Sequence, residues 1–343
     1  MFDLIVVGAT TEARDAAVAA GRLGASVALV HPWFPGWSAP GGAAEWLRRL
    51  RDAIASCTRQ VSPDTPRQRF SSGLPSPAAL TEEVIERDFL AHRVIQQRLD
   101  RLQVQVFEGQ VRFLTEGELS LRTLGRELTL CGSRLVVATG TQTDMPPWAS
   151  SRGRAVLAVD DLRRLEQIPR SLLIVGGGAT GLEAAFLFSL LGSRVTLIDR
   201  NVRLALGDGM TAATIVRHLQ RLGVRLLLQS EVTTAVENSE GSVSVELLSG
   251  ERLTAERVLV TTERRGQTAG LGLEELGVRL DERGRLWCDE QLQTWSRNVV
   301  GLGDVVGHPR ELAEKPTAPR DLVWCLLGRG GIAQRPNPVS ASP

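Results

Sequence analysis

The sequence predicts an α/β protein with two nucleotide-binding units built on parallel sheets, and a repeated order of elements supports this prediction. Near the N-terminus, Leu4–Val7, Thr11–Leu23 and Val27–Val30 have the patterns of a strand, a helix and a strand. The same βαβ order returns in the middle of the chain, from Leu172 to Ile198. Short continuous apolar runs are typical of parallel strands that are buried on both faces. An internal duplication of two Rossmann-like units is therefore expected.

The remaining elements follow from local composition. Residues 57–80 are rich in Ser, Pro and Arg and are expected to form a loop or an irregular insertion. Apolar residues at helical spacing predict a helix from about Glu82 to Leu102. Beyond about Gly328 the chain is rich in Gly, Pro and Ser and is expected to be disordered. Between these segments the patterns predict strands at 135–138, 224–228 and 258–260, a helix near 211–222 and a hairpin at 232–248.

Composition and charge exclude several classes of function. The 343 residues have a net charge of +1, which gives no electrostatic basis for binding nucleic acid or an anionic membrane. The four cysteines are far apart in sequence, which excludes a CxxC redox pair and a short-spaced zinc site. No apolar run is long enough to span a bilayer, and the N-terminus has the pattern of a strand rather than a signal peptide. We therefore expect a cytoplasmic protein with no metal, nucleic-acid or membrane partner.

One glycine-rich motif predicts a specific binding site. Gly176-Gly177-Gly178-Ala179-Thr180-Gly181 matches G-x-G-x-x-G directly after an apolar strand and at the start of a helix. We expect Gly176 to permit a tight turn, Gly178 to let a pyrophosphate approach the backbone, and Gly181 to let helix and strand pack closely. The helix N-terminus then offers N–H groups and the positive end of its dipole to the phosphates.

The end of the next strand indicates which dinucleotide binds. Asp199 lies at the distance expected for a carboxylate that accepts the hydroxyls of the adenosine ribose. Its charge would repel the 2′-phosphate of NADP(H), whereas Arg200 and Arg203 would attract that phosphate. Because the acid occupies the discriminating position, NAD(H) is expected in preference to NADP(H), with Arg200 lining the same site.

Together these segments resemble the pyridine nucleotide-disulfide oxidoreductase family, in particular its dihydrolipoamide dehydrogenase and soluble flavin transhydrogenase branches. The resemblance covers most of residues 1–312 and includes Gly270–Leu280, Asp289–Leu292 and Asn298–Val306. It implies an FAD-type domain that is split by an inserted NAD(P)-type domain. The implied domains are 1–147 and 265–320 for the two parts of the FAD-type domain, 148–264 for the NAD(P)-type domain, and 321–343 for a disordered tail.

The resemblance also implies a flavin site. FAD contacts would come from the first βαβ unit at Gly8, from the strand end Ala138-Thr139-Gly140, and from Gly303-Asp304. Asp304 would hydrogen-bond the ribityl or phosphate region of the FAD.

The first glycine motif departs from the family pattern. It reads Gly8-Ala9-Thr10-Thr11-Glu12-Ala13, so the Cβ of Thr10 is expected to crowd the pyrophosphate. Glu12 places a carboxylate at the helix start, where it would compete with an anion for the N–H groups. His31 stands where the family has a ribose-binding acid, and this histidine, like the others, is expected to be a surface residue or a hydrogen-bonded one. The resemblance thus implies that FAD binds, whereas the sequence of this motif argues against FAD binding.

The redox disulfide of the family is absent. Ser38 and Ala43 align with the two cysteine positions, which excludes disulfide reduction by the family route. Leu47 replaces the lysine that pairs with the glutamate corresponding to Glu183. The chain ends before the dimerisation domain of the family, so a monomer is expected. The segment that starts at His308 is expected to be a loop rather than part of a catalytic pair.

Two functions remain open. The first is an oxidoreductase that passes hydride from NAD(P)H to FAD without a redox disulfide, with Glu183 as the catalytic residue near the junction of nicotinamide and flavin. Its electron acceptor is open between another nicotinamide, a quinone and oxygen. The second is a non-catalytic NAD(H)-binding protein with a decayed FAD site, which would respond to the nucleotide by a domain rotation. Because Thr139-Gly140 and Gly303-Asp304 are retained, the oxidoreductase is the working hypothesis.

Overall fold

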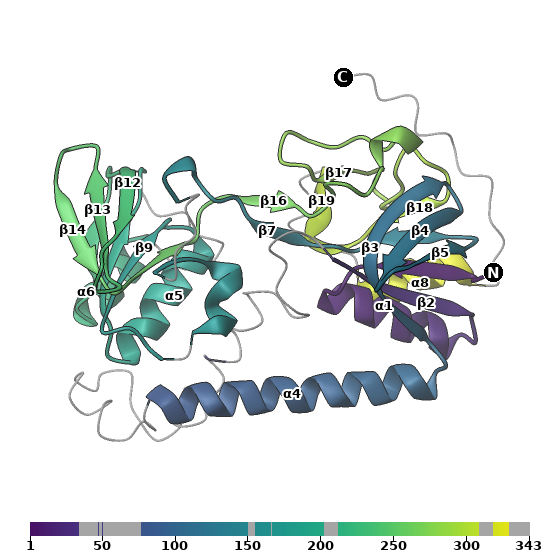
Figure 1. Ribbon diagram of the computed structural model, residues 1–343, viewed down its shortest axis with the longest axis horizontal. Coiled ribbons are helices and arrows are strands. Elements are labelled where there is room, and N and C mark those ends of the chain that lie inside the picture. Colours follow the sequence, from purple (N-terminus) through teal and green to yellow (C-terminus); the bar gives the residue numbers. More distant parts are fainter. Residues whose placement is uncertain are drawn as a thin grey trace. The chain divides into compact units, whose positions relative to one another are not determined.

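The computed structural model describes residues 1–33, 47, 50, 77–149, 155–165, 167–201, 212–308 and 318–328. The chain forms two compact units (Figure 1). The first unit comprises Met1–Gly41, Ala91–Gln142 and Arg264–Pro343, and the second comprises Gly42–Leu90 and Thr143–Glu263. Each unit is built on a mainly or wholly parallel sheet, which confirms the predicted α/β class.

The first unit contains a seven-stranded sheet in the order β18-β6-β1-β2-β3-β4-β5. The first five strands in this order run parallel, and β3, β4 and β5 form an antiparallel meander. The strands at its centre are fully buried, as their continuous apolar runs predict. Their bounds are Leu4–Val7 (β1), Val27–Pro32 (β2), Gln105–Thr115 (β3), Glu118–Thr123 (β4), Arg126–Cys131 (β5), Leu135–Val137 (β6) and Val299–Gly301 (β18).

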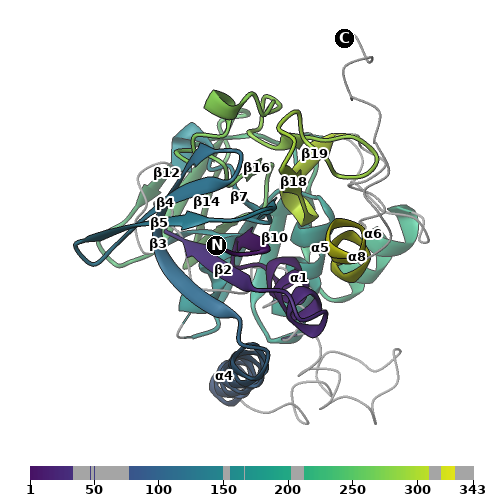
Figure 2. The ribbon, with the colours of Figure 1, turned by 90° about the vertical axis from the view of Figure 1, so that its right-hand side faces the viewer.

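Helix α1 (Thr11–Arg22) packs against helix α8 (Pro319–Leu327), and the two lie side by side in Figure 2. Residues 321–327, which were expected to begin a disordered tail, are therefore helical. The reason is an apolar run in α8 that buries Leu322 and Val323 in the core of the first unit. A third helix, α4, extends from Pro77 to Arg101. It begins within the expected loop 57–80, because proline is accepted in the first turn of a helix; residues 57–76 lie outside the described part of the chain.

The second unit has a five-stranded parallel sheet in the order β11-β10-β9-β15-β8. Successive residues of β9 point to opposite faces: Leu172 and Ile174 belong to one apolar cluster, and Leu173 and Val175 to another. The first cluster includes residues of helix α5 (Ala179–Leu190) and helix α6 (Ala212–Arg221). The strands are Val156–Ala158 (β8), Ser171–Val175 (β9), Arg194–Ile198 (β10), Arg225–Leu227 (β11) and Arg257–Val260 (β15).

The other face of this sheet is covered by a three-stranded antiparallel sheet, which contributes Val232, Val243 and Val245 to the second cluster. Its strands are Val232–Glu237 (β12), Val243–Leu247 (β13) and Arg252–Ala255 (β14), so the expected hairpin at 232–248 is confirmed. Four short strands form two further pairs, β7 (Thr141–Thr143) with β16 (Arg264–Gly266) and β17 (Leu286–Trp287) with β19 (Val306–His308). Short 3-10 helices are Pro147–Ala149 (η1), Val159–Arg164 (η2), Glu274–Leu276 (η3) and Gly303–Val305 (η4).

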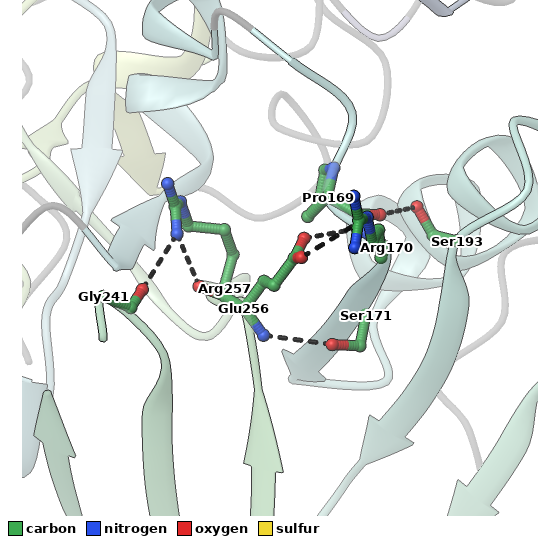
Figure 3. A network of polar contacts seen from close by, with 7 residues as sticks. All are labelled: Pro169, Arg170, Ser171, Ser193, Gly241, Glu256 and Arg257. Atoms are coloured by element: carbon green, nitrogen blue, oxygen red, sulfur yellow. Dashed lines mark hydrogen bonds and ion pairs between the residues drawn. The ribbon is translucent and has the colours of Figure 1, made fainter. Parts of the chain in front are cut away.

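A polar network fastens the amino ends of β9 and β15 to each other (Figure 3). The carboxylate of Glu256 accepts a hydrogen bond of 2.6 Å from the backbone N–H of Arg170, and the N–H of Glu256 donates to Ser171 Oγ at 3.0 Å. At the amino end of β10, Ser193 Oγ donates to the carbonyl oxygen of Pro169 at 2.6 Å. This network lies at the edge of the sheet opposite the glycine-rich loop, so we assign it to stability rather than to ligand binding. No described helix has the length and apolar character needed to cross a membrane.

Candidate functional site

The glycine-rich loop of the second unit connects β9 to α5 at the carboxyl edge of the sheet. Gly176 has a φ of +119°, a conformation that side-chain-bearing residues rarely adopt. A Cβ at Gly181 would collide with the carbonyl oxygen of Gly176. In contrast, a Cβ at Gly178 would meet no heavy atom of the described residues within 4 Å, apart from its chain neighbours. The loop is thus packed tightly against other protein atoms at Gly176 and Gly181, whereas the space beside Gly178 is open.

Thr261 holds the first turn of this loop, a role that the sequence motif does not predict. Its hydroxyl lies 2.9 Å from the carbonyl oxygen of Gly176 and 3.1 Å from that of Val175. Thr261 follows β15, which is the neighbour of β9 in the sheet. A polar residue directly after a buried strand was the available signal, but the pairing of β15 with β9 was needed to place it.

Asp199 follows β10, and its carboxylate reaches the glycine-rich loop. Oδ2 accepts a hydrogen bond of 2.5 Å from the N–H of Gly177, and Oδ1 accepts one of 2.6 Å from the N–H of Asn201. A carboxylate has about four lone-pair directions, so two remain for further donors such as ribose hydroxyls. The structure therefore brings Asp199 together with the glycine loop, as the motif predicts.

Arg200 points its guanidinium at a second acid. Its Nη2 lies 3.3 Å from Oε1 of Glu263, and both side chains are largely exposed. Glu263 comes from the segment after β15 and was not anticipated from the sequence. Arg203, the other arginine named above, lies outside the described residues.

The first unit has a comparable loop between β1 and α1. A Cβ at Gly8 would collide with the carbonyl oxygen of Ala138, so this turn is as tight as the one at Gly176. Thr10 is the N-cap of α1: its Oγ1 accepts from the N–H of Ala13 at 3.2 Å and donates to the carbonyl oxygen of Ala138 at 3.1 Å. Its side chain thus fills the centre of the loop, where Gly178 leaves open space in the second unit.

The other residues that were expected to contact flavin lie around this loop, because β1, β6 and β18 are neighbours in the sheet. A Cβ at Gly140 would lie 2.8 Å from Cγ2 of Thr10, and one at Gly303 would lie 3.2 Å from Cγ of Glu12. Thr139 is buried, and its Oγ1 has no hydrogen-bond partner among the described residues. Asp304 is exposed in η4.

Comparison with known proteins decides the family. Residues 2–319 match the pyridine nucleotide-disulphide oxidoreductase family. The chain belongs to this family. It is 30% identical over 314 residues to the soluble pyridine nucleotide transhydrogenase of Chromohalobacter salexigens, which covers 90% of this chain and 67% of the relative. The soluble pyridine nucleotide transhydrogenase of Mycobacterium bovis (strain BCG / Pasteur 1173P2) is 29% identical over 317 residues, with the same coverage. The chain therefore spans about two thirds of the length of these relatives.

Solved structures show the same fold. The HOCl-induced flavoprotein disulfide reductase RclA from Escherichia coli has a TM-score of 0.78 at 22% identity, covering 96% of this chain and 72% of that chain. LpdA from Mycobacterium tuberculosis has a TM-score of 0.79 at 22% identity, covering 95% and 73% respectively. The resemblance inferred from the sequence is thus confirmed: the chain is a member of a family of NAD(P)H-dependent flavoprotein oxidoreductases.

The described residues of this family member fit FAD only in part. The tight turn at Gly8 and the unpartnered hydroxyl of Thr139 are compatible with a ligand at the strand ends. The hydroxyl of Thr10, however, binds the N–H of Ala13 at the start of α1, where the diphosphate of a dinucleotide binds in this fold, and Glu12 adds a negative charge in the same turn. The residues do not fit that diphosphate.

His31, at the end of β2, is buried, which corrects the expectation of a surface or hydrogen-bonded histidine. Its side chain is enclosed because β2 lies between β1 and β3. Neither ring nitrogen has a hydrogen-bond partner among the described residues, and Nδ1 lies 3.6 Å from Oε1 of Glu108. Burial lowers the pKa of His31, while Glu108 acts in the opposite direction.

His308 ends the short strand β19 instead of lying in a loop, and its ring stacks on Trp287 at 4.5 Å between centroids.

The structure describes only some of the positions that align with the redox residues of the family. Glu183 lies on α5, is half-buried and has a polar contact of its own. Leu47 is buried in the apolar cluster of the second unit, and Ser38 and Ala43 lie outside the described residues. The three described cysteines are free thiols, and burial raises the pKa of Cys288 to about 12, so this thiol is unsuited to thiolate chemistry.

Proposed function

We propose that this chain is an oxidoreductase that binds NAD(H) in its second unit and uses it as hydride donor without a redox disulfide. The loop at Gly176–Gly181 supports this proposal most directly. Its ends are closed by backbone contacts at Gly176 and Gly181, while Gly178 leaves space at the N-terminus of α5. This is the arrangement that receives a pyrophosphate on helix N–H groups.

The charges at the adenosine end favour NAD(H) over NADP(H). The carboxylate of Asp199 is held at the loop by two backbone N–H groups, and it would oppose a 2′-phosphate. Arg200, one of the two arginines expected to attract such a phosphate, is paired with Glu263. Both features reduce the positive potential that NADP(H) needs.

The chemistry of the reaction would come from the cofactors. A flavin on the first unit would supply the hydride acceptor, and the protein would supply binding and orientation. Glu183 is proposed to lie near the nicotinamide. Since the relatives are named soluble pyridine nucleotide transhydrogenases, a second nicotinamide nucleotide is the acceptor we favour over a quinone or oxygen.

A spectroscopic experiment tests this function. The purified protein would be mixed anaerobically with FAD and NADH, and the visible bands of the flavin followed. We expect the bands to bleach faster than in a control without protein. Normal NADH binding without any faster bleaching would contradict the proposal.

A second function is supported by one specific observation. Because Thr10 caps the start of α1 and Glu12 places a carboxylate in the same turn, both against a diphosphate there, the chain is also suited to bind NAD(H) without catalysis. The outcome just described, NADH binding with no flavin reduction, is the one this second function expects.

A further inference from the structure

We infer that Thr10 and Glu12 form a built-in cap over the diphosphate position of the first unit, so that flavin binds this chain as a dissociable molecule whose adenylate half adds no affinity. The inference rests on the proposed function for its role in a reaction. The physical claim about the first unit is independent of the NAD(H) site.

The second unit supplies an internal comparison for the first. Thr10 and Gly178 are the N-caps of α1 and α5, and their backbones have nearly the same conformation, with φ and ψ of −74° and 169° at Thr10 and −72° and 177° at Gly178. The two helices therefore begin with the same backbone conformation at the cap. They differ in the side chain at the cap, which is absent in one and present in the other.

The side chain of Thr10 takes the place of a ligand in its hydrogen bonding. Its Oγ1 accepts from the N–H of Ala13, one of the N–H groups that the start of a helix offers to an anion. The same hydroxyl donates to the carbonyl oxygen of Ala138, which ties the cap to the neighbouring strand β6. A diphosphate would have to displace both bonds and the Thr10 methyl group that lies against Gly140.

Glu12 adds charge to this obstruction. Its side chain lies against Gly303 of η4, with Cγ 3.2 Å and the carboxyl carbon Cδ 3.4 Å from the position of a Cβ there. The first turn of α1 carries this acid, whereas the first turn of α5 carries none. A carboxylate at a helix N-terminus satisfies the dipole that would otherwise attract phosphate and repels the diphosphate directly.

As a consequence, the diphosphate of a dinucleotide lowers the affinity of this unit for the flavin instead of raising it. The diphosphate of FAD meets a filled and negatively charged position, while a flavin without phosphates avoids it. We therefore expect FAD to bind the parent protein no more tightly than riboflavin does, and to be lost on gel filtration.

The test measures dissociation constants by quenching of flavin fluorescence, with FAD and riboflavin as probes. Three proteins are compared: the parent, the double variant Thr10→Gly/Glu12→Gln, and the control Asp15→Asn, which removes an exposed acid from the same helix outside its first turn. We expect the double variant to bind FAD about ten-fold more tightly or better, with riboflavin affinity unchanged. The control is expected to match the parent with both probes.

Two results would overturn the inference: stoichiometric FAD retained by the parent through gel filtration, or an unchanged FAD affinity in a double variant with parent-like circular dichroism. If the double variant does not fold, Glu12→Gln alone keeps the Thr10 cap and is expected to show a smaller gain for FAD, and no gain would count against the inference. NADH affinity is measured in the same proteins. A failure to bind NADH would remove the proposed function and leave the flavin result standing.

Discussion

The carboxylate of Asp199 accepts a hydrogen bond of 2.5 Å from the backbone N–H of Gly177, which links the end of β10 to the centre of the glycine-rich loop. One side chain therefore both shapes the loop and carries the charge expected to select the ribose. Asp199→Asn keeps an acceptor and removes the charge. We expect NADH affinity to fall about ten-fold and the preference for NADH over NADPH to shrink, as measured by calorimetric titration with both nucleotides. Unchanged affinities for both would show that the adenosine ribose is not bound here.

The ion pair between Arg200 and Glu263 leads to a prediction of the opposite sign. Glu263→Gln removes the acid that holds the guanidinium at 3.3 Å, so Arg200 becomes available to a 2′-phosphate. We expect NADPH to bind about two- to five-fold more tightly, a size in keeping with an exposed ion pair. Glu251→Gln is the matched control, since it breaks an exposed pair of the same unit with Arg225. An equal change in both variants would mean that Arg200 has no special role.

Thr261 is predicted to act through the loop that it supports. Thr261→Val has the same shape but lacks the hydroxyl that meets the carbonyl oxygen of Gly176 at 2.9 Å. We expect a loss of about 1–3 kcal/mol in the free energy of unfolding, measured by urea denaturation, together with weaker NADH binding. Thr261→Ser retains the hydroxyl and should restore most of the NADH affinity. Loss of affinity in both variants would point to packing instead of the hydrogen bond.

The duplicated βαβ pattern, the glycine loop and Asp199 were predictable from the sequence because each depends on residues close together along the chain. The pairing of Arg200 with Glu263 was not, since the two residues are brought together only by the order of the strands. The burial of His31 was not predictable either, because His31 follows the apolar run Val27–Val30 and is enclosed only through the pairing of β2 with β1 and β3. Most of helix α8 falls in the segment 321–343 that the sequence predicts to be disordered, because nine residues are too few to stand out; packing against α1 stabilises the helix.

The cap at Thr10 is also predicted to stabilise α1. Thr10→Ala removes the acceptor for the N–H of Ala13 and should lower the free energy of unfolding by about 1 kcal/mol, whereas Thr10→Gly should cost only a few tenths. Chemical denaturation of the two variants measures the difference. Equal losses in both would indicate that the Thr10 hydroxyl does not cap the helix.

Buried His31 predicts how stability depends on pH. Burial lowers its pKa in the folded state, so below about pH 6.5 the unfolded chain binds a proton that the folded chain resists. The free energy of unfolding should therefore fall as the pH drops through this range. His31→Phe should flatten this part of the profile when unfolding is followed between pH 7 and pH 5, two values that bracket the ordinary pKa of histidine at about 6.5. A profile identical to that of the parent would mean that His31 does not contribute.

The central claim is that NAD(H) binds across the open centre of the loop at Gly178, and calorimetric titration with NADH tests it most directly. Gly178→Val places a side chain where, apart from its chain neighbours, no described residue has an atom within 4 Å of a Cβ, so the fold should persist while the pyrophosphate is excluded. Glu256→Gln alters the polar network at the opposite edge of the same sheet and serves as the control. We predict that NADH binds the parent and the control and is lost from Gly178→Val. Equal NADH affinity in all three proteins would contradict the claim.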